Sequence, residues 1–353
     1  MAREEDRQDT CFDERDTIFS RIRLEPGTTR YRDYYTRKPE KRKVDDEFRS
    51  GGPGRFVDRM PEAAMVESTF GLITRLRSLV RGYPGEYSCG ADADSVSGEE
   101  ITRLLMQQAS RYGAVFSEAI ETEERFYYSF HGRGDRYGEK VENFLPRAMV
   151  FAVQMDGREI ATAPGIREAV EVAGSYLRVA VPALVAAAYL RSLGYEAVAH
   201  IDGESEVVLP PMAARAGFGK IGRHGLLVSK SYGSLLRIAA LTTDAPLVPG
   251  NAGDAESFPL EKACEACRKC ADFCPSNAIP DGSIIERYDE ETRNVDHEAC
   301  FSMWKKFGTD CGVCLAVCPY SVAAPEPGSQ ETRAPEPGTP DFLKRYMFGV
   351  EKG

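Results

Sequence analysis

The spacing of the cysteines constrains this chain more than any other feature of its sequence. Eight of the ten cysteines lie in two runs, Cys264-x2-Cys267-x2-Cys270-x3-Cys274-Pro275 and Cys300-x10-Cys311-x2-Cys314-x3-Cys318-Pro319. The first run has the spacing of bacterial two-cluster ferredoxins, in which three thiolates hold one [4Fe–4S] cluster and the fourth ligates the other. Structural zinc and disulfides are the alternatives, but zinc sites rarely use a third cysteine at this spacing. The spacing therefore predicts two [4Fe–4S] clusters.

Each run is expected to share its cysteines between both clusters. Short loops let three neighbouring thiolates converge on one cluster, while the distant fourth thiolate ties the two halves of the module together. One cluster is expected at Cys264, Cys267, Cys270 and Cys318, and the other at Cys274, Cys300, Cys311 and Cys314.

Composition and charge limit the class of protein. The chain has 353 residues, of which 42% are hydrophobic and 28% charged, as is ordinary for a soluble globular protein. A net charge of −10 does not favour nonspecific nucleic-acid binding. Residues 1–10 contain neither an apolar segment nor a twin arginine, and the nearly apolar run at 179–190 is too short to span a bilayer. We expect a cytoplasmic protein, where thiolates stay reduced and available to iron.

Four regions are expected along the chain. Residues 1–60 are rich in charge and predict a solvated, irregular arm that wraps the domain. Residues 61–255 predict an α/β catalytic domain, and residues 256–322 contain the cysteine module. Residues 323–353 contain the segment APEPG twice and predict a Pro-rich linker and C-terminal tail.

Hydrophobic periodicity and helix-stop residues predict a mixed α/β (α+β) fold. Helices are expected at 61–81, about 97–113 and about 166–193. Strands are expected at 126–130, 148–153, 195–201, 226–228 and 237–242.

Residues 217–222 read Gly-Phe-Gly-Lys-Ile-Gly and match the dinucleotide-binding pattern G-x-G-x-x-G. That fingerprint requires a strand before it and a helix after it. Here two prolines at 210–211 precede the pattern and Arg-His-Gly closes it, so NAD binding is not expected. The residues remain a glycine-dense loop at which something large approaches the backbone closely.

The stretch at 216–247, together with Leu193-Gly194-Tyr195 and the two cysteine runs, resembles the corrinoid-dependent reductive dehalogenases, here of a non-exported type. It is similar, more distantly, to epoxyqueuosine reductase. The resemblance covers residues 145–320, and residues 12–49 resemble the N-terminal region of dehalogenases specifically. It implies a nitroreductase-like cobalamin-binding domain followed by a two-cluster ferredoxin-like module.

The resemblance also implies cobalamin bound base-off, with no protein histidine below the cobalt. His131 agrees with this, because Ser129 stands where the lower-ligand motif Asp-x-His-x-x-Gly has its aspartate. The clusters would deliver single electrons to the corrin cobalt, which carries the hard chemistry. The corrinoid is expected against the glycine-dense loop and the stretch after it, at Gly217, Phe218, Gly219, Gly222, Arg223, His224, Gly225, Ser229, Tyr232, Gly233, Thr242 and Asp244.

By the same resemblance, the proton donor falls on Tyr176 and its supporting cation on Arg237. A free tyrosine titrates at about pH 10, so a nearby cation eases the loss of its proton. From the residues alone, Tyr176 could be a core aromatic and Arg237 part of a structural ion pair. Asp202 stands where several dehalogenases have asparagine, and the epoxyqueuosine enzymes use an aspartate as general acid in this neighbourhood.

The expected function is reductive dehalogenation of a small organohalide, aromatic ones included. Electrons would come from an external low-potential donor of the ferredoxin or flavodoxin type. An epoxyqueuosine-reductase-like activity is the alternative, although no strongly basic segment suggests a tRNA substrate. A two-cluster electron carrier without its own catalytic site is a third hypothesis. No membrane partner is expected, and the substrate and the oligomeric state stay open.

Overall fold

The computed structural model describes residues 11–50, 60–82, 86, 96–250, 260–280, 285–287, 290–292 and 294–322. The expected Pro-rich linker and C-terminal tail lie outside these residues.

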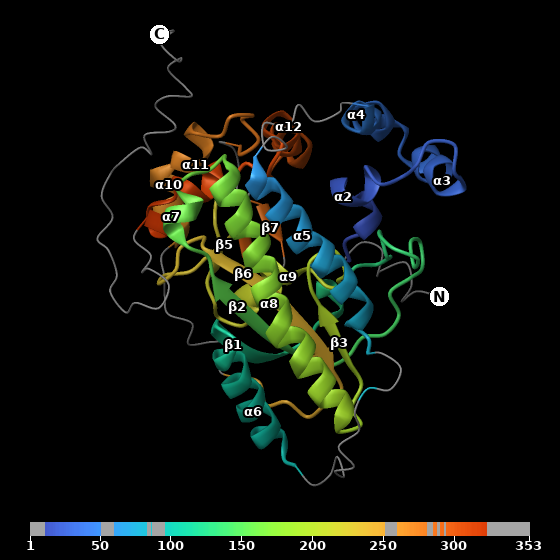
Figure 1. The fold of residues 1–353 in the computed structure, drawn as a ribbon, viewed down its shortest axis with the longest axis vertical. Helices are drawn as coiled ribbons and strands as arrows, with labels where there is room; N and C mark the ends of the chain where they lie inside the picture. The colour runs from blue at the N-terminus through green and yellow to red at the C-terminus, as the bar shows by residue number, and fades with distance from the viewer. Residues whose placement is uncertain are drawn as a thin grey trace.

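A four-stranded antiparallel sheet forms the centre of the fold, with the strand order β1-β2-β6-β3 (Figure 1). Its strands are β1 (Ala114–Glu121), β2 (Arg147–Gln154), β6 (Leu236–Thr243) and β3 (Ala197–His200). β2 is almost wholly buried, as strands covered on both faces are. β2 and β6 pair from Arg147 opposite Thr243 to Gln154 opposite Leu236. Arg237 therefore lies at the end of the sheet where β2 finishes and β6 begins.

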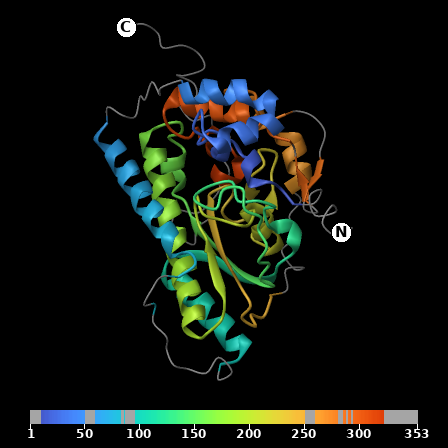
Figure 2. The same cartoon turned by 90° about the vertical axis from the view of Figure 1, so that its right-hand side faces the viewer.

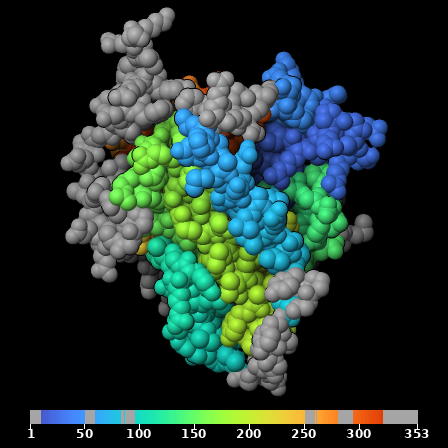
Figure 3. Space-filling model, viewed as in Figure 1, coloured from blue at the N-terminus to red at the C-terminus, as the bar shows by residue number. Residues whose placement is uncertain are grey.

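Three long helices lie side by side on one side of the sheet in the space-filling view (Figure 3). They are α5 (Pro61–Leu76), α6 (Gly98–Arg111) and α8 (Ile166–Ser192). Two of them, α6 and α8, pack on the strands of the sheet, and α5 packs on α8. Alanines on α8, such as Ala183 and Ala187, share one buried apolar cluster with Phe151 and Leu241 of the sheet. By length and composition α8 could cross a membrane, but here it is the core helix packed against β2, β3 and β6.

The opposite face of the sheet is covered by shorter elements. α9 (Leu209–Arg215) and the 3-10 turn η5 (Glu124–Phe126) pack there. Phe126, Tyr127 and Met212 share a second buried cluster with Ala240 of β6. The sheet is therefore the middle of three layers.

The cysteine module lies at one end of the sheet, at the top of Figure 1. Its elements are α10 (Leu260–Cys267), α11 (Lys269–Asp272), β7 (Ile285–Arg287), β8 (Glu290–Thr292), α12 (His297–Phe307), α13 (Val313–Ala316) and α14 (Pro319–Val322). The short α7 (Gly157–Ile160), which follows β2, packs against α13. The start of α8 and the start of β6 lie at this same end, so the module abuts the region that carries Tyr176 and Arg237.

The N-terminal arm is not the irregular, solvated segment that its charge predicted. It forms η1 (Glu14–Asp16), α2 (Ile18–Arg21), α3 (Thr29–Arg37) and α4 (Pro39–Ser50), and it lies beside the module (Figure 2). Tyr34 and Tyr35 of α3 are buried, and their hydroxyls donate to Asp16 at 2.9 Å and to Asp45 at 2.8 Å. The prediction was wrong because several charged side chains serve as partners inside the arm rather than facing water.

Most expected elements of the central region are confirmed, including the helices at 98–111 and 166–192 and the strand at 147–154. The strand expected at 126–130 is wrong, because η5 ends at Phe126 and only isolated bridges follow, from Tyr127 to Val207 and from Phe130 to Lys140. β1 was not expected at all. It is a partly exposed edge strand, and Ser117 and Glu118 interrupt its apolar pattern.

Candidate functional site

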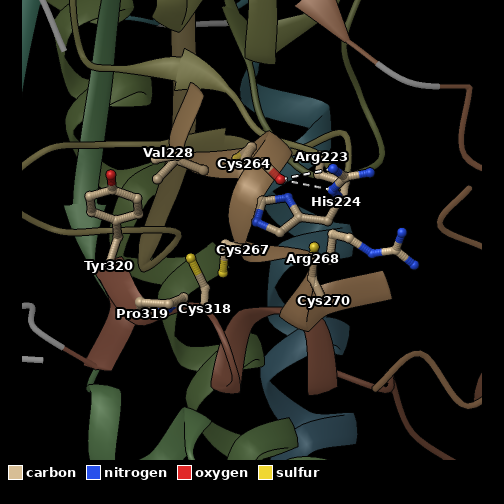
Figure 4. A pocket seen from close by; sticks show the side chains of 11 residues that line it. Arg223, His224, Val228, Cys264, Cys267, Arg268, Cys270, Cys318, Pro319 and Tyr320 are labelled. Atoms are coloured by element: carbon tan, nitrogen blue, oxygen red, sulfur yellow. Dashed lines mark hydrogen bonds between the residues drawn. The ribbon is translucent and has the colours of Figure 1, made fainter. Parts of the chain in front are cut away.

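Cys264, Cys267, Cys270 and Cys318 line one pocket (Figure 4). The first two cysteines lie on α10, Cys270 lies on α11, and Cys318 comes directly before α14. The structure thus brings the distant fourth cysteine to the other three. We call these residues the first quartet.

The second quartet consists of Cys274, Cys300, Cys311 and Cys314, and these cysteines also lie close together. Burial, followed by repulsion from Cys300 and Cys274, raises the pKa of Cys311 to about 12. Burial also raises the pKa of the Cys314 thiol well above its usual range, with further repulsion from the other three members. The repulsion shows that these four thiols lie near one another, and Cys270 of the first quartet is also near Cys314.

The donor sets of both quartets suit iron–sulfur clusters. Buried thiols of raised pKa do not ionise at neutral pH on their own, and a bound metal centre supplies the positive charge that stabilises their thiolates. Among the described residues, no three His, Cys, Asp or Glu side chains are close enough to hold a single metal ion. A [4Fe–4S] cluster spreads its ligands over four irons, so its thiolates lie further apart than the ligands of one zinc ion.

The glycine-dense loop forms a tight hairpin of β4 (Lys220–Ile221) and β5 (Leu227–Val228). A Cβ on Gly219 would overlap the carbonyl oxygen of Val228 and lie 2.7 Å from its carbonyl carbon. A Cβ on Gly222 would lie 2.7 Å from Cγ2 of the same valine. The close approach predicted for this loop is therefore made by the chain's own second strand, and Gly219 offers no open surface to a cofactor.

Arg223 and His224, at the turn of the hairpin, line the pocket of the first quartet. Arg223 donates from Nε and Nη2 to the carbonyl oxygen of Cys264 at 3.1 and 2.8 Å, the bonds drawn in Figure 4. Nδ1 of His224 accepts the Leu226 N–H at 3.1 Å, so its Nε2 carries the proton and donates to Ser234 at 2.9 Å. Burial lowers the pKa of His224 to about 4, so this histidine is neutral at pH 7.

Residues on both sides of the hairpin hold it beside the rest of the domain. Phe218 and Tyr232 pack on Phe116 of β1, with ring centroids 5.1 and 5.4 Å away. Ser229 and Gly233 exchange backbone hydrogen bonds of 2.8 and 2.9 Å. A Cβ on Gly233 would overlap the backbone between Tyr320 and Ser321, directly after the last cysteine. This stretch is therefore tied to the cysteine module.

Thr242 and Asp244 lie at the opposite end of β6 from Arg237. The strand rises by about 3.3 Å per residue, so roughly 17 Å separates Thr242 from Arg237. Thr242 is buried and bonded to Nε2 of His200 at 2.9 Å, and the carboxylate of Asp244 accepts the Glu196 N–H at 2.8 Å. The structure does not bring these two residues to the hairpin, and it gives both of them structural partners.

Tyr176 and Arg237 lie in direct contact. The guanidinium carbon of Arg237 lies 4.0 Å from the centroid of the Tyr176 ring, and its Nε donates to Ser175 at 3.1 Å. Tyr176 packs on a buried cluster that includes Leu315, and Cys314 packs on the same cluster. The predicted acid and its cation therefore lie beside the second quartet.

The surroundings of Tyr176 act on its pKa in opposite directions. Arg237 lowers the pKa, whereas burial and the carboxylates of Asp202 and Asp310 raise it, and the balance leaves it raised. The phenol thus keeps its proton at rest, with a cation against its ring. Asp202 follows β3 and is engaged by Arg77, whose Nη2 contacts the carboxylate at 2.9 Å and whose Nε donates to the backbone carbonyl at 2.8 Å.

Sequence reasoning missed Glu168, in the first turn of α8. The side chain is fully buried, and neither carboxyl oxygen has a hydrogen-bond partner among the described residues. Burial, and then Asp310, raises the pKa of Glu168 well above its usual range, while Arg237 opposes the shift. An acidic residue in a first turn ordinarily complements the helix dipole at the surface, so the sequence carries no signal of this burial.

Comparison with known proteins assigns the chain its relatives. Residues 263–322 match the family "4Fe-4S dicluster domain". A tetrachloroethene reductive dehalogenase of Desulfitobacterium hafniense is 34% identical over 203 residues, which are 54% of this chain and 36% of the relative. An epoxyqueuosine reductase of Lactococcus garvieae (strain Lg2) is 36% identical over 115 residues, which are 31% of each chain.

A solved reductive dehalogenase, described as suggesting a mechanism for B12-dependent dehalogenation, matches with a TM-score of 0.63 at 26% identity. The match covers 72% of this chain and 37% of that one. A catabolic reductive dehalogenase in complex with 3-bromo-4-hydroxybenzoic acid matches with a TM-score of 0.61 over 72% of this chain and 37% of its own, at 26% identity.

These matches confirm the resemblance to reductive dehalogenases, the more distant one to epoxyqueuosine reductases, and the mixed α/β fold with a dicluster domain in its C-terminal part. Both groups of relatives are oxidoreductases. The chain spans little more than a third of the length of the dehalogenases that it matches.

Proposed function

We propose that the chain is a corrinoid- and iron–sulfur-dependent reductase that removes halogen from small organohalides, aromatic ones included. The observation that carries this proposal is the stacked Tyr176–Arg237 pair, which packs on the same apolar cluster as Cys314 of the second quartet. A proton donor and a route for electrons then meet at one end of the sheet. The similarity to reductive dehalogenases supports the reaction class.

Reductive dehalogenation consumes an organohalide, two electrons and one proton, and it yields the hydrogen-substituted product and a halide ion. The two quartets would each hold one [4Fe–4S] cluster and pass the electrons singly. The hydroxyl of Tyr176 would supply the proton. The guanidinium of Arg237 lies against the ring at 4.0 Å and would stabilise the tyrosinate that remains.

The corrinoid rests on the relative whose dehalogenation is described as B12-dependent. When bound, a corrinoid supplies the low-potential metal that breaks the carbon–halogen bond. The residues expected to hold it do not form one cradle here. The space beside Gly219 is occupied by β5 of the same hairpin. Arg223 and His224 line the pocket of the first quartet. Thr242 and Asp244 lie at the far end of β6. We therefore assign no corrinoid contact to a residue of this chain.

The electron donor would be an external low-potential protein of the ferredoxin or flavodoxin type, and the site of action the cytoplasm. A second candidate function, epoxyqueuosine-reductase-like chemistry, would use Asp202 as the acid. One observation favours it: Asp202 is close enough to Tyr176 to raise the pKa of that phenol. Against it, both the carboxylate and the backbone carbonyl of Asp202 are engaged by Arg77.

The test is anaerobic reconstitution of the full chain with iron, sulfide and hydroxocobalamin, followed by a halide-release assay on a panel of halogenated phenols. We expect about eight iron and eight sulfide per chain, retained corrinoid, and halide release that depends on a low-potential reductant. Clusters without retained corrinoid or halide release would favour the electron carrier. Tightly bound zinc instead of iron in anaerobically produced protein would overturn the cluster assignment.

A further inference from the structure

We propose that Arg223 raises the reduction potential of the cluster held by the first quartet and thereby makes it the more easily reduced of the two clusters. This inference rests on the proposed function, because it requires that both quartets hold [4Fe–4S] clusters. It assigns Arg223 a positioning and tuning role beside the cluster, in place of the corrinoid contact expected from the sequence.

The Arg223 guanidinium is held in place at the edge of the pocket. The residue is 4% exposed, and Nε and Nη2 are fixed on the backbone carbonyl of Cys264. Nη1 is buried and has no hydrogen-bond partner among the described residues. An unsatisfied donor on a buried charge is costly, so this group requires an acceptor. The negative charge of a cluster in this pocket would stabilise the guanidinium as a whole.

A fixed, buried cation has a definite effect on a metal cluster. Reduction adds one negative charge to the cluster, and the cation stabilises the reduced form more than the oxidised form. Charge, hydrogen bonds to sulfur and solvent exposure all set cluster potentials. Burial weakens the screening of that interaction.

The other described charges differ in position or sign. His224 lines the same pocket but is neutral at pH 7, since burial lowers its pKa to about 4. Arg268 also lines the pocket, but its side chain is 45% exposed and pairs with Asp272 at 3.5 Å. Water and salt screen such a charge. Beside the second quartet lies Glu168, whose buried carboxyl faces Gly312 and supplies no positive charge. At the second site, Arg237 lies against the Tyr176 ring and bonds to Ser175. Arg223 is thus distinguished by being fixed on the backbone carbonyl of a cluster cysteine.

The experiment compares Arg223→Gln with Arg268→Gln in the full, anaerobically reconstituted chain. Each variant removes one positive charge from the same pocket, one buried and one exposed. Iron and sulfide content is measured first, and each cluster is then followed by EPR in a redox titration. The signal that Cys270→Ser alters is assigned to the first quartet.

We expect Arg223→Gln to make the first cluster at least tenfold harder to reduce, which lowers its potential by about 59 mV for a one-electron couple. We expect Arg268→Gln to change the same equilibrium by less than about threefold, since its charge is screened. The potential of the second cluster should stay unchanged in both variants and serves as the internal reference.

Equal shifts in the two variants, or no shift in an Arg223→Gln protein with full iron content, would overturn the inference. If Arg223→Gln does not retain iron, Arg223→Lys decides, because it keeps the charge and loses the paired bonds to Cys264. A potential within threefold of wild type then supports the tuning role, and a shift of tenfold or more contradicts it. Wild-type protein that binds no clusters at all would refute the proposed function instead, which keeps the two failures distinct.

Discussion

The two halves of the cysteine module contain the same backbone turn, but different side chains surround that turn in each half. In Cys267-Arg268-Lys269-Cys270 and in Cys311-Gly312-Val313-Cys314, the residue after the first cysteine is left-handed, with φ of 52° at Arg268 and 60° at Gly312. Each of these residues precedes a four-residue helix, α11 or α13. The same turn is thus built once with arginine and once with glycine.

The difference between the turns follows from their surroundings. The Arg268 side chain is 45% exposed, so the first turn has room for it. A Cβ on Gly312 would lie 2.6 Å from Oε1 of Glu168 and 2.8 Å from the Cβ of Ala163. The second turn is pressed against the start of α8, and glycine is required there for space as well as for φ. The second half is therefore the one docked on the helix that carries Tyr176.

The largest expected effect is on the rate of halide release and concerns Tyr176, which lies beside the second quartet. Tyr176→Phe keeps the ring on Arg237 and removes only the hydroxyl. Loss of a positioned general acid costs about 10²–10⁴ in rate, so halide release should fall by that order. Iron content and corrinoid retention should stay at the wild-type level.

Asp202→Asn is the matched control for Tyr176→Phe and should be mild, because Asp202 is already engaged by Arg77. The reverse pattern, with Asp202→Asn inactive and Tyr176→Phe active, would identify the carboxylate as the acid and favour the epoxyqueuosine-like alternative.

The next prediction tests the crowding at the second turn. Gly312→Ala should lower the free energy of unfolding by about 2–5 kcal/mol, because a left-handed alanine costs about 1–2 kcal/mol and overpacking adds about 1–3 kcal/mol. Glu168 is fully buried and has little room to yield. Denaturant unfolding under anaerobic conditions, followed by iron release, measures the loss.

Arg268→Gly is the control in the first half. It relieves the strain of a left-handed arginine but adds freedom to the unfolded chain, so the net change should be about 1 kcal/mol or less. If the two substitutions cost the same, the two turns do not differ in the way that their contacts indicate.

How far the sequence predicts this molecule depends on how local each feature is. The cysteine spacing is local, and the structure places the four members of each predicted quartet together. Glycine density around Gly219 indicated a close approach but not that Val228 makes it. Thr242 and Asp244 are near the loop in sequence, yet an extended strand carries them away. The burial of Glu168 could not be predicted, because the turn at Gly312 that packs against it lies over 140 residues later in the chain.

The arm touches the second half of the module. Arg21 pairs with buried Asp45 at 3.1 Å and with Glu298 of α12 at 2.7 Å. Phe19 packs on Phe301 and Trp304 of the same helix, with centroids 5.7 and 5.5 Å away. The helix α12 also carries Cys300, so the arm packs on a helix that supplies one ligand of the second quartet.

Asp45→Asn should therefore affect the second cluster more than the first. Removing one partner of a buried pair often costs about 3–5 kcal/mol, but Arg21 keeps Glu298, so we expect about 1–3 kcal/mol. Burial raises the pKa of Asp45 despite Arg21, which shows that pairing only partly offsets desolvation. Lys41→Gln, at a half-exposed partner of Glu298, should cost about 1 kcal/mol or less. Thermal unfolding and the air sensitivity of each EPR signal measure the effect of both variants. Equal air sensitivity of the two clusters in Asp45→Asn would contradict the claim that the arm stabilises the second cluster more than the first.

The smallest expected effect is on the pH dependence of stability, to which His224, beside the first quartet, and Glu168, beside the second, contribute differently. His224 braces the hairpin behind the first quartet, and burial lowers its pKa from 6.5 to about 4. The unfolded chain binds this proton first, so stability is complete above about pH 6.5 and is lost as the pH falls toward 4. Between pH 7 and 6 the loss should be about 0.7 kcal/mol, and His224→Gln should remove it.

Glu168, behind the second quartet, has the opposite sign. Burial raises its pKa, so the native state keeps a proton that the unfolded chain releases, and stability falls as the pH rises above the unfolded pKa of 4.5. Glu168→Gln should abolish that decline and stabilise the chain on the alkaline side, with no effect on the acid side. Unfolding measured from pH 6 to 8 in the wild type and in each variant separates the two slopes. If both variants changed the slope in the same direction, His224 and Glu168 would not have opposite effects on the pH dependence of stability.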